Sequence, residues 1–182
     1  MFYNFKIRKN TKTVLIFRIV LIILIIVNLS FVWNNSSKES KESNKSSTSI
    51  AKTVTEHVVK DYKSLPKNKQ EEHVKRINVK IRSGAHFAEF IPLGLFAFLL
   101  VLAFLEFKDK DFWYFVLTAT VISVMFSAFC ALTDEVHQIF VKGRSFQVID
   151  ILTDSIGSLC GAVFAILITF IFKNKLTKSE IF

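Results

Sequence analysis

The sequence predicts an all-α integral membrane protein, a bundle of four transmembrane helices with a long extracellular linker after the first. Hydrophobic residues make up 51% of the 182-residue chain, and its mean hydropathy is positive. The apolar residues also gather in four runs of about 20 residues, the length that crosses a bilayer as a helix. The chain is therefore expected to form one membrane domain rather than a soluble one.

The first apolar run covers 14–33 and follows a basic leader that contains Lys6, Arg8 and Lys12. No cleavage site of the small-x-small kind follows Trp33, so the run favours an uncleaved anchor over a signal peptide. The basic leader predicts a cytoplasmic N-terminus in the plasma membrane. We therefore assign residues 1–33 to a leader and an N-terminal anchor.

The second segment, 34–80, is predicted to be an extracellular polar linker. Its first part, 34–49, is composed almost entirely of Ser, Asn, Lys and Glu. Such a composition cannot bury a core, so this part is expected to be solvated and poorly ordered. Residues 50–62 have the spacing of a short amphipathic helix, which Pro66 would terminate.

The remaining three runs cover 84–107, 112–132 and 149–172 and form a membrane domain at 81–172. Pro92 is expected to kink or loosen the first of them. A tight connection joins the first two runs. Four spans return the C-terminus to the cytoplasm, where the basic tail 173–182 suits the positive-inside rule.

The orientation meets one opposing observation. The segment 34–82, expected outside, holds twelve Lys and Arg. The positive-inside rule is weak for loops of this length, so the orientation is kept. The formal charge of +9 is interpreted as contact with anionic lipid, and the chain contains no nucleic-acid-binding module. Cys130 and Cys160 lie in apolar runs without metal-ligand spacing and are interpreted as small buried residues.

Polar and ionisable residues at the ends of the last three spans all fall on one side of the membrane. They form the predicted polar site, whose residues are His86, Glu89, Asp134, Glu135, Gln138, Arg144, Asp150 and Asp154. A lone carboxylate inside an apolar helix is unfavourable, so Asp154 requires a partner. Arg144 and His86 are the nearest candidate cations. His57, His73 and His137 have no evident partner by spacing and are interpreted as surface or interface residues.

Several interpretations of this cluster remain open. It can be a buried ion-pair network that holds three helices together. It can be a ligand site in which Arg144 binds a phosphate or carboxylate. It can also be a Mg²⁺ or Mn²⁺ site of carboxylate oxygens that serves chemistry on a lipid-linked substrate. A proton relay is least favoured, because the polar groups do not cross the membrane. The sequence identifies no catalytic residue and no cofactor.

Small residues predict how two spans pack. Gly157 and Gly161 lie on one face of the last span, in a motif that lets helix backbones approach closely. Ser123, Ser127 and Cys130 form a small stripe on the preceding span. We expect these two stripes to pack against each other.

Two separated motifs resemble the VanZ-like family of bacterial membrane proteins. The first is RSGAHFAEFIPLG, residues 82–94, and the second is DEVHQIFVKGRSFQVIDILTDSIGSLCG, residues 134–161. The sequence departs from the usual family pattern at Ser83, Phe90, Lys142 and Phe146, which leaves the acidic and basic site residues in place. The match covers about half of the chain.

The resemblance implies a multi-pass plasma-membrane protein of a Gram-positive bacterium. The family's namesake is associated with low-level resistance to the glycopeptide teicoplanin. Besides the lipid bilayer, the expected partner is therefore a lipid-linked cell-wall intermediate or a glycopeptide, which the protein would act on or shield. A membrane-embedded, metal-assisted enzyme and a structural partner in an envelope complex are the alternatives, because a family resemblance gives a context and not a reaction.

Overall fold

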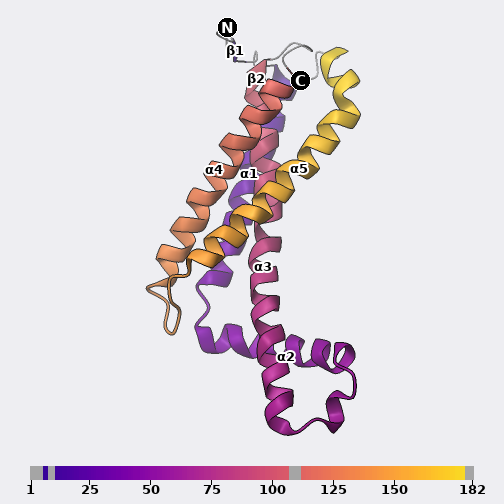
Figure 1. The fold of residues 1–182 in the computed structure, drawn as a ribbon. Coiled ribbons are helices and arrows are strands. Elements are labelled where there is room, and N and C mark those ends of the chain that lie inside the picture. The colour runs from indigo at the N-terminus through magenta and orange to yellow at the C-terminus, as the bar shows by residue number, and fades with distance from the viewer. Residues whose placement is uncertain (1–5, 8–10, 107–111, 179–182) are drawn as a thin grey trace.

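The computed structural model describes residues 6–7, 11–106 and 112–178, and within these ranges four helices are long and apolar enough to cross a membrane. They are α1 (Lys12–Ser36), α3 (Lys67–Phe104), α4 (Phe112–Gln138) and α5 (Val148–Lys178). The four run side by side as a bundle (Figure 1). The prediction of an all-α membrane protein with four spans is confirmed.

The helices begin and end at different residues from those predicted. α1 starts beyond Thr11, whose side chain accepts a hydrogen bond from the Val14 amide at 3.3 Å and so caps the helix. α3 begins at Lys67 instead of 84 and continues without a break through Pro92. α4 extends to Gln138 instead of 132. The predicted bounds followed the apolar runs, whereas these helices continue into the polar residues that flank the runs.

The prediction of a poorly ordered linker over 34–49 is wrong. Helix α2 spans Ser40–Val58, and a short 3-10 helix, η1 (Tyr62–Ser64), follows it. The reason is tertiary packing, because Ala51 and Thr55 of α2 are fully buried where α2 packs against α3. A helix of weak intrinsic propensity becomes stable when one of its faces is packed.

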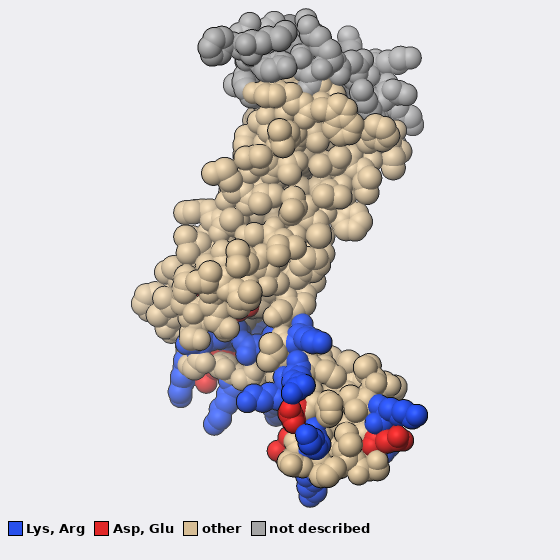
Figure 2. Space-filling view, in the orientation of Figure 1, with Lys and Arg blue, Asp and Glu red and all other residues tan. Residues whose placement is uncertain are grey.

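The polar extension made by α2, η1 and the start of α3 lies beyond one end of the bundle (Figure 1). Lys and Arg side chains gather on this extension, whereas the surface of the bundle shows almost none in Figure 2. Aliphatic and aromatic residues such as Ile16, Phe129 and Phe164 are more than half exposed on the bundle. Such a surface suits the hydrocarbon of a bilayer.

Two short strands were not predicted. β1 (Lys6–Ile7) and β2 (Leu105–Glu106) pair antiparallel at the end of the bundle opposite the polar extension. The predicted tight connection at 107–111 lies outside the described residues, as does the end of the tail at 179–182.

The predicted contact between the glycines of α5 and α4 is wrong, because the glycines face α3. A Cβ added at Gly157 would collide with the carbonyl of Phe87, and one at Gly161 with the carbonyl of Ile91. A Cβ at Gly94 of α3 would meet the backbone of Ser158 in the same way. Glycine on both helices lets the two backbones touch, which a serine stripe on α4 could not match.

The serine stripe of α4 is buried elsewhere. Ser123 and Ser127 are fully buried. Ser123 lines an apolar cavity of about 300 Å³ together with Ile22 of α1 and Ala97 of α3. α4 therefore turns its small residues toward α1 and α3, and α3 packs against each of the other long helices.

Candidate functional site

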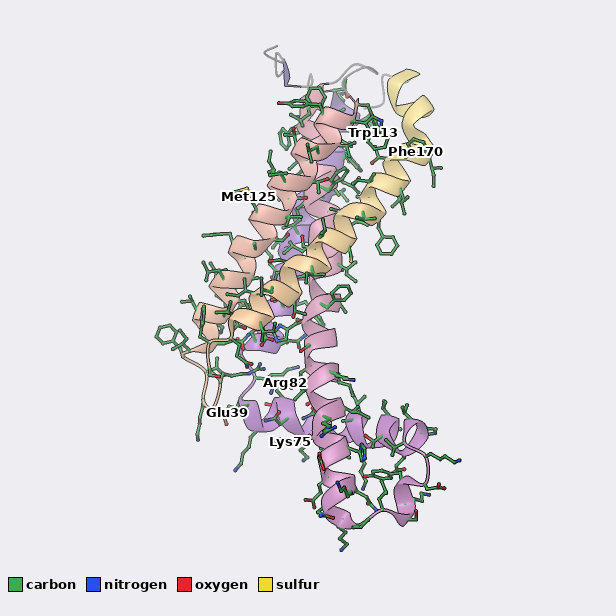
Figure 3. All side chains as sticks on the ribbon, viewed as in Figure 1. Glu39, Lys75, Arg82, Trp113, Met125 and Phe170 are labelled. Atoms are coloured by element: carbon green, nitrogen blue, oxygen red, sulfur yellow. The ribbon has the colours of Figure 1, made fainter. Side chains whose placement is uncertain are left out.

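The predicted site residues lie at the end of the bundle next to the polar extension. There α1 and α4 end, α5 begins, and α3 passes from the extension into the bundle. Figure 3 places Arg82 at this level, and Trp113 and Phe170 toward the opposite end. Trp113 and Phe170 stack with ring centroids 6.3 Å apart and belong to the apolar half.

An imidazole and two carboxylates join α3 to α5. Nδ1 of His86 lies 3.5 Å from Oδ1 of Asp154, and Nε2 lies 3.9 Å from Oδ2 of Asp150. Asp154 is fully buried, and neither of its carboxylate oxygens has a hydrogen bond of good geometry within the described part of the chain. The partner expected for Asp154 is therefore His86, and within that part of the chain no ion pair joins Asp154 to Arg144.

A second group surrounds Asp134 near the end of α4. Ser36 Oγ donates to Asp134 Oδ2 at 2.7 Å, and Gln138 Nε2 donates to the same oxygen at 2.8 Å. Gln138 lies one turn after Asp134, so both side chains project from one helix face. All three side chains are buried. Asp134 is thus satisfied by two neutral donors rather than by a cation.

The two glutamates accept hydrogen bonds from different segments. Asn35 Nδ2 donates to Glu89 Oε1 at 2.9 Å, which ties the end of α1 to α3. The amide of Gln147 donates to Glu135 Oε2 at 2.8 Å, which ties the loop before α5 to α4. Both contacts fix backbone segments around the site.

Arg144 lies in the loop between α4 and α5 and binds neutral oxygens. Its guanidinium donates to Oε1 of Gln138 at 3.3 Å, to the carbonyl of Asn35 at 3.4 Å and to the carbonyl of Lys38 at 3.3 Å. Gly143 has a φ of 77°, so the turn that presents Arg144 needs glycine there.

Arg82 of α3 is the second guanidinium. It donates to Oδ1 of Asn44 at 3.2 Å. Burial lowers the pKa of Arg144 from its ordinary value, and the positive charge of Arg82 lowers this pKa further. Among the ion pairs of the described residues, none joins Arg82 or Arg144 to a carboxylate. The two positive charges therefore influence each other without a direct ion pair among the described residues, and the carboxylates of Asp134, Glu135 and Asp150 offset part of this effect on Arg144.

A small cavity of about 70 Å³ opens between these groups. Its lining residues are Asn35, Ser36, Arg82, Ala85, His86, Glu89 and Arg144. Two guanidiniums line it, whereas the side chains of Asn35, Ser36 and His86 already face carboxylates, one of which, Glu89, belongs to the lining itself. The two guanidiniums suit the cavity to an acceptor, above all to an anion.

The structure brings the eight predicted site residues into one region but gives them different places. His86, Glu89 and Arg144 line the cavity. The other predicted residues lie behind it as partners or supports, namely Asp134, Glu135, Gln138, Asp150 and Asp154.

Sequence reasoning missed Asn35 and Ser36, which it assigned to the linker. The available signal was that Asn34, Asn35 and Ser36 follow the first apolar run directly, at the membrane boundary. His137, interpreted as a surface or interface residue, lies against the end of α1. Its Nε2 lies 3.1 Å from Ser37 Oγ, and its ring meets Trp33 edge-on with centroids 5.3 Å apart.

The metal-site interpretation relied on Asp134, Glu135, Asp150 and Asp154. Within residues 6–7, 11–106 and 112–178, no three His, Cys, Asp or Glu side chains are grouped so that they could hold a metal ion. The carboxylates bind separate partners instead: a serine and a glutamine, a backbone amide, and an imidazole.

A family model described as VanZ/LLP1 matches residues 14–171, a range that runs from α1 to α5 and includes α2. No curated protein and no solved structure matches the chain.

Proposed function

Because the chain belongs to the VanZ/LLP1 family and carries four candidate membrane spans, we propose that it is a cell-envelope protein whose site binds an anionic group of an envelope ligand. The ligand is a lipid-linked wall component or a glycopeptide of the teicoplanin type. Its phosphate or carboxylate occupies the cavity between Arg82 and Arg144. Binding there lets the protein act on this ligand or shield it.

The observation that carries the proposal is the pair of guanidiniums at one cavity. Arg144 is half-buried and its guanidinium donates to three neutral oxygens. The charge of Arg82 disfavours that of Arg144, while Asp134, Glu135 and Asp150 favour it without pairing with it directly. A buried charge is expensive unless an opposite charge or good hydrogen bonds compensate it. A phosphate or carboxylate would supply a negative charge in direct contact with Arg144, and guanidinium forks bind such groups with two parallel hydrogen bonds.

The size of the cavity suits the charged group alone. About 70 Å³ is room for a few water-sized groups. A wall intermediate or a glycopeptide is much larger, so the rest of the ligand would extend along the bilayer or into solvent. Ala85 both lines the cavity and is exposed, so the cavity reaches the surface there.

We also propose that the site faces the outside of the plasma membrane and that both termini are cytoplasmic. The basic leader and the basic tail support this orientation. A single cysteine at Ser46, on the exposed side of α2, tests it in a background with Cys130→Ala and Cys160→Ala. We expect a membrane-impermeant maleimide to label it in intact cells. Labelling only after permeabilisation would reverse the orientation.

Binding is tested with the full chain in lipid nanodiscs. The probes are a polyprenyl diphosphate, an uncharged polyprenol of equal length, and teicoplanin. For the anionic ligand we expect Arg144→Gln to weaken binding about 10- to 100-fold, the loss that follows when hydrogen bonds to a charged group worth about 1.5–3 kcal/mol are removed.

Arg76→Gln is the matched control, because Arg76 is exposed on the polar extension and pairs with Glu72 at 2.7 Å. It removes the same charge far from the cavity, and we expect less than about a twofold change, since exposed ion pairs contribute little. Equal losses in both variants, or equal binding of the charged and uncharged polyprenyl probes, would contradict the proposal.

A further inference from the structure

Helix α2 carries side chains of different character on different sides. Ala51 and Thr55 are buried against α3. Lys41, Lys45 and Lys52 are exposed, and at ~100° per residue they share an arc of ~40° on one flank. The helix therefore has a packed side and a basic flank next to it.

The basic flank faces away from the bundle. Thr48 and Lys52 line a cavity of about 480 Å³ together with residues of α3 between Lys67 and Asn78. This part of α3 lies beyond α2 on the side remote from the membrane-spanning helices (Figure 1). Lys52 therefore points away from the membrane-spanning part of the bundle. The opposite flank of α2 points toward it.

That opposite flank is apolar and exposed. Ile50, Val54 and Val58 follow one another every four residues, and 55%, 37% and 71% of their surface is accessible. At ~100° per residue they lie roughly opposite the lysines. In Figure 1 the later part of α2 projects beyond α3.

We infer that α2 lies on the bilayer surface, with Ile50, Val54 and Val58 inserted at the boundary between headgroups and acyl chains. Only Ser37 to Glu39 separate α2 from the membrane-spanning α1, so α2 starts at the membrane boundary. A helix with an apolar stripe on one flank and lysines on the other is the type that binds in the interface plane. The lysines then point into water.

The docked helix also holds the rim of the polar site. Asn44 Oδ1 accepts the hydrogen bond of Arg82 at 3.2 Å, and the amide of Ser40 donates to the carbonyl of Lys142 at 3.2 Å. Ser40 also lies against Gly143, next to Arg144. Binding of α2 to the bilayer therefore positions both guanidinium-bearing segments at the level of the lipid headgroups.

Nitroxide accessibility tests the inference on the full chain. Single cysteines replace Val54 or Lys45 in a background with Cys130→Ala and Cys160→Ala. The labelled proteins are reconstituted into vesicles of phosphatidylethanolamine and phosphatidylglycerol. Power saturation then compares the accessibility of each label to oxygen, which enriches in the bilayer, with accessibility to a water-soluble nickel chelate.

We expect the ratio of oxygen to nickel accessibility to be several-fold higher at position 54 than at position 45. Val58 and Lys41 form a second pair with the same expectation, which keeps the test available if Val54→Cys does not fold. Equal ratios at both flanks would overturn the inference. Spin–spin broadening at position 54 would overturn it as well, because the stripe would then contact a second copy of the chain.

Discussion

The two sides of α3 differ in how closely they are packed. Toward α5, Gly94, Gly157 and Gly161 bring backbone against backbone, and an added methyl group has no space. Toward α1, the contacts near the site are made by side chains, such as Asn35 to Glu89, and the 70 Å³ cavity lies among them. The same helix thus has a closed side and an open side.

The difference separates what holds the fold from what is available to a ligand. A glycine seam fixes the position of α5 on α3 without polar groups. Given that position, the polar groups at the open side do not need to satisfy one another completely, and Arg82 and Arg144 can remain next to a cavity. Sites that bind ligands commonly keep such locally unfavourable arrangements, which the rest of the fold supports.

The largest effect is expected where the two sides meet, at His86 and Asp154. His86→Ala should destabilise the protein by about 3 kcal/mol, because it leaves the fully buried Asp154 without the imidazole that faces it. The double variant with Asp154→Ala should be less destabilised than His86→Ala alone. Unfolding in mixed micelles with increasing SDS measures both. Additive losses would mean that the two side chains do not act as a pair.

A smaller loss is expected on the closed side. Gly161→Ala should destabilise by about 1–3 kcal/mol, because the new Cβ meets the Ile91 carbonyl and the helices must move apart. The same unfolding titration measures it. A Gly161→Ala protein as stable as the wild type would show that α5 does not pack on α3 through its glycines.

On the open side, filling the cavity should affect binding more than stability. Ala85→Leu places a larger side chain at the cavity lined by Arg82 and Arg144, so the polyprenyl diphosphate should bind at least about tenfold more weakly, or by ~1.4 kcal/mol. Ala85 is exposed, so stability should change by less than ~0.5 kcal/mol. Unchanged binding would place the ligand elsewhere.

The smallest effect is expected at Gly84, which serves as the control for Gly161. A Cβ at Gly84 meets nothing within 4 Å. Gly84→Ala should therefore stabilise α3 by up to about 1 kcal/mol through helix propensity alone. A loss of stability in the SDS titration would indicate that substitution of any glycine in α3 or α5 is harmful, and the seam would not be special.

Much of the fold could be predicted from the sequence, since run length and hydropathy depend on local composition. The four spans and the gathering of His86, Asp134 and Asp154 at one end followed from them. The partners of the glycine seam could not be predicted, because periodicity gives the face of a helix but not the neighbour it meets. Gly94 of α3 lies against Ser158 of α5, but its position in the sequence does not identify that neighbour.

The remaining errors share one cause. Helix α2, Asn35 and Ser36 belong to a polar stretch whose order depends on contacts with α3, α4 and the loop before α5. Composition predicts disorder for such a stretch, because composition carries no information about tertiary contacts. The sequence offered both His86 and Arg144 as partners of Asp154, and the choice of His86 depends on the direction in which the α4–α5 loop points.

The central claim is that Arg82 and Arg144 bind one anionic group together. The most direct measurement is a double-mutant cycle on polyprenyl diphosphate binding in nanodiscs, with Arg82→Gln, Arg144→Gln and the double variant. We predict that each single change weakens binding about 10- to 100-fold and that the double variant loses less than the product of the two, because both guanidiniums bind the same group. Binding within about twofold of the wild type in all three variants, together with a loss of stability, would contradict the account and make both arginines part of the scaffold.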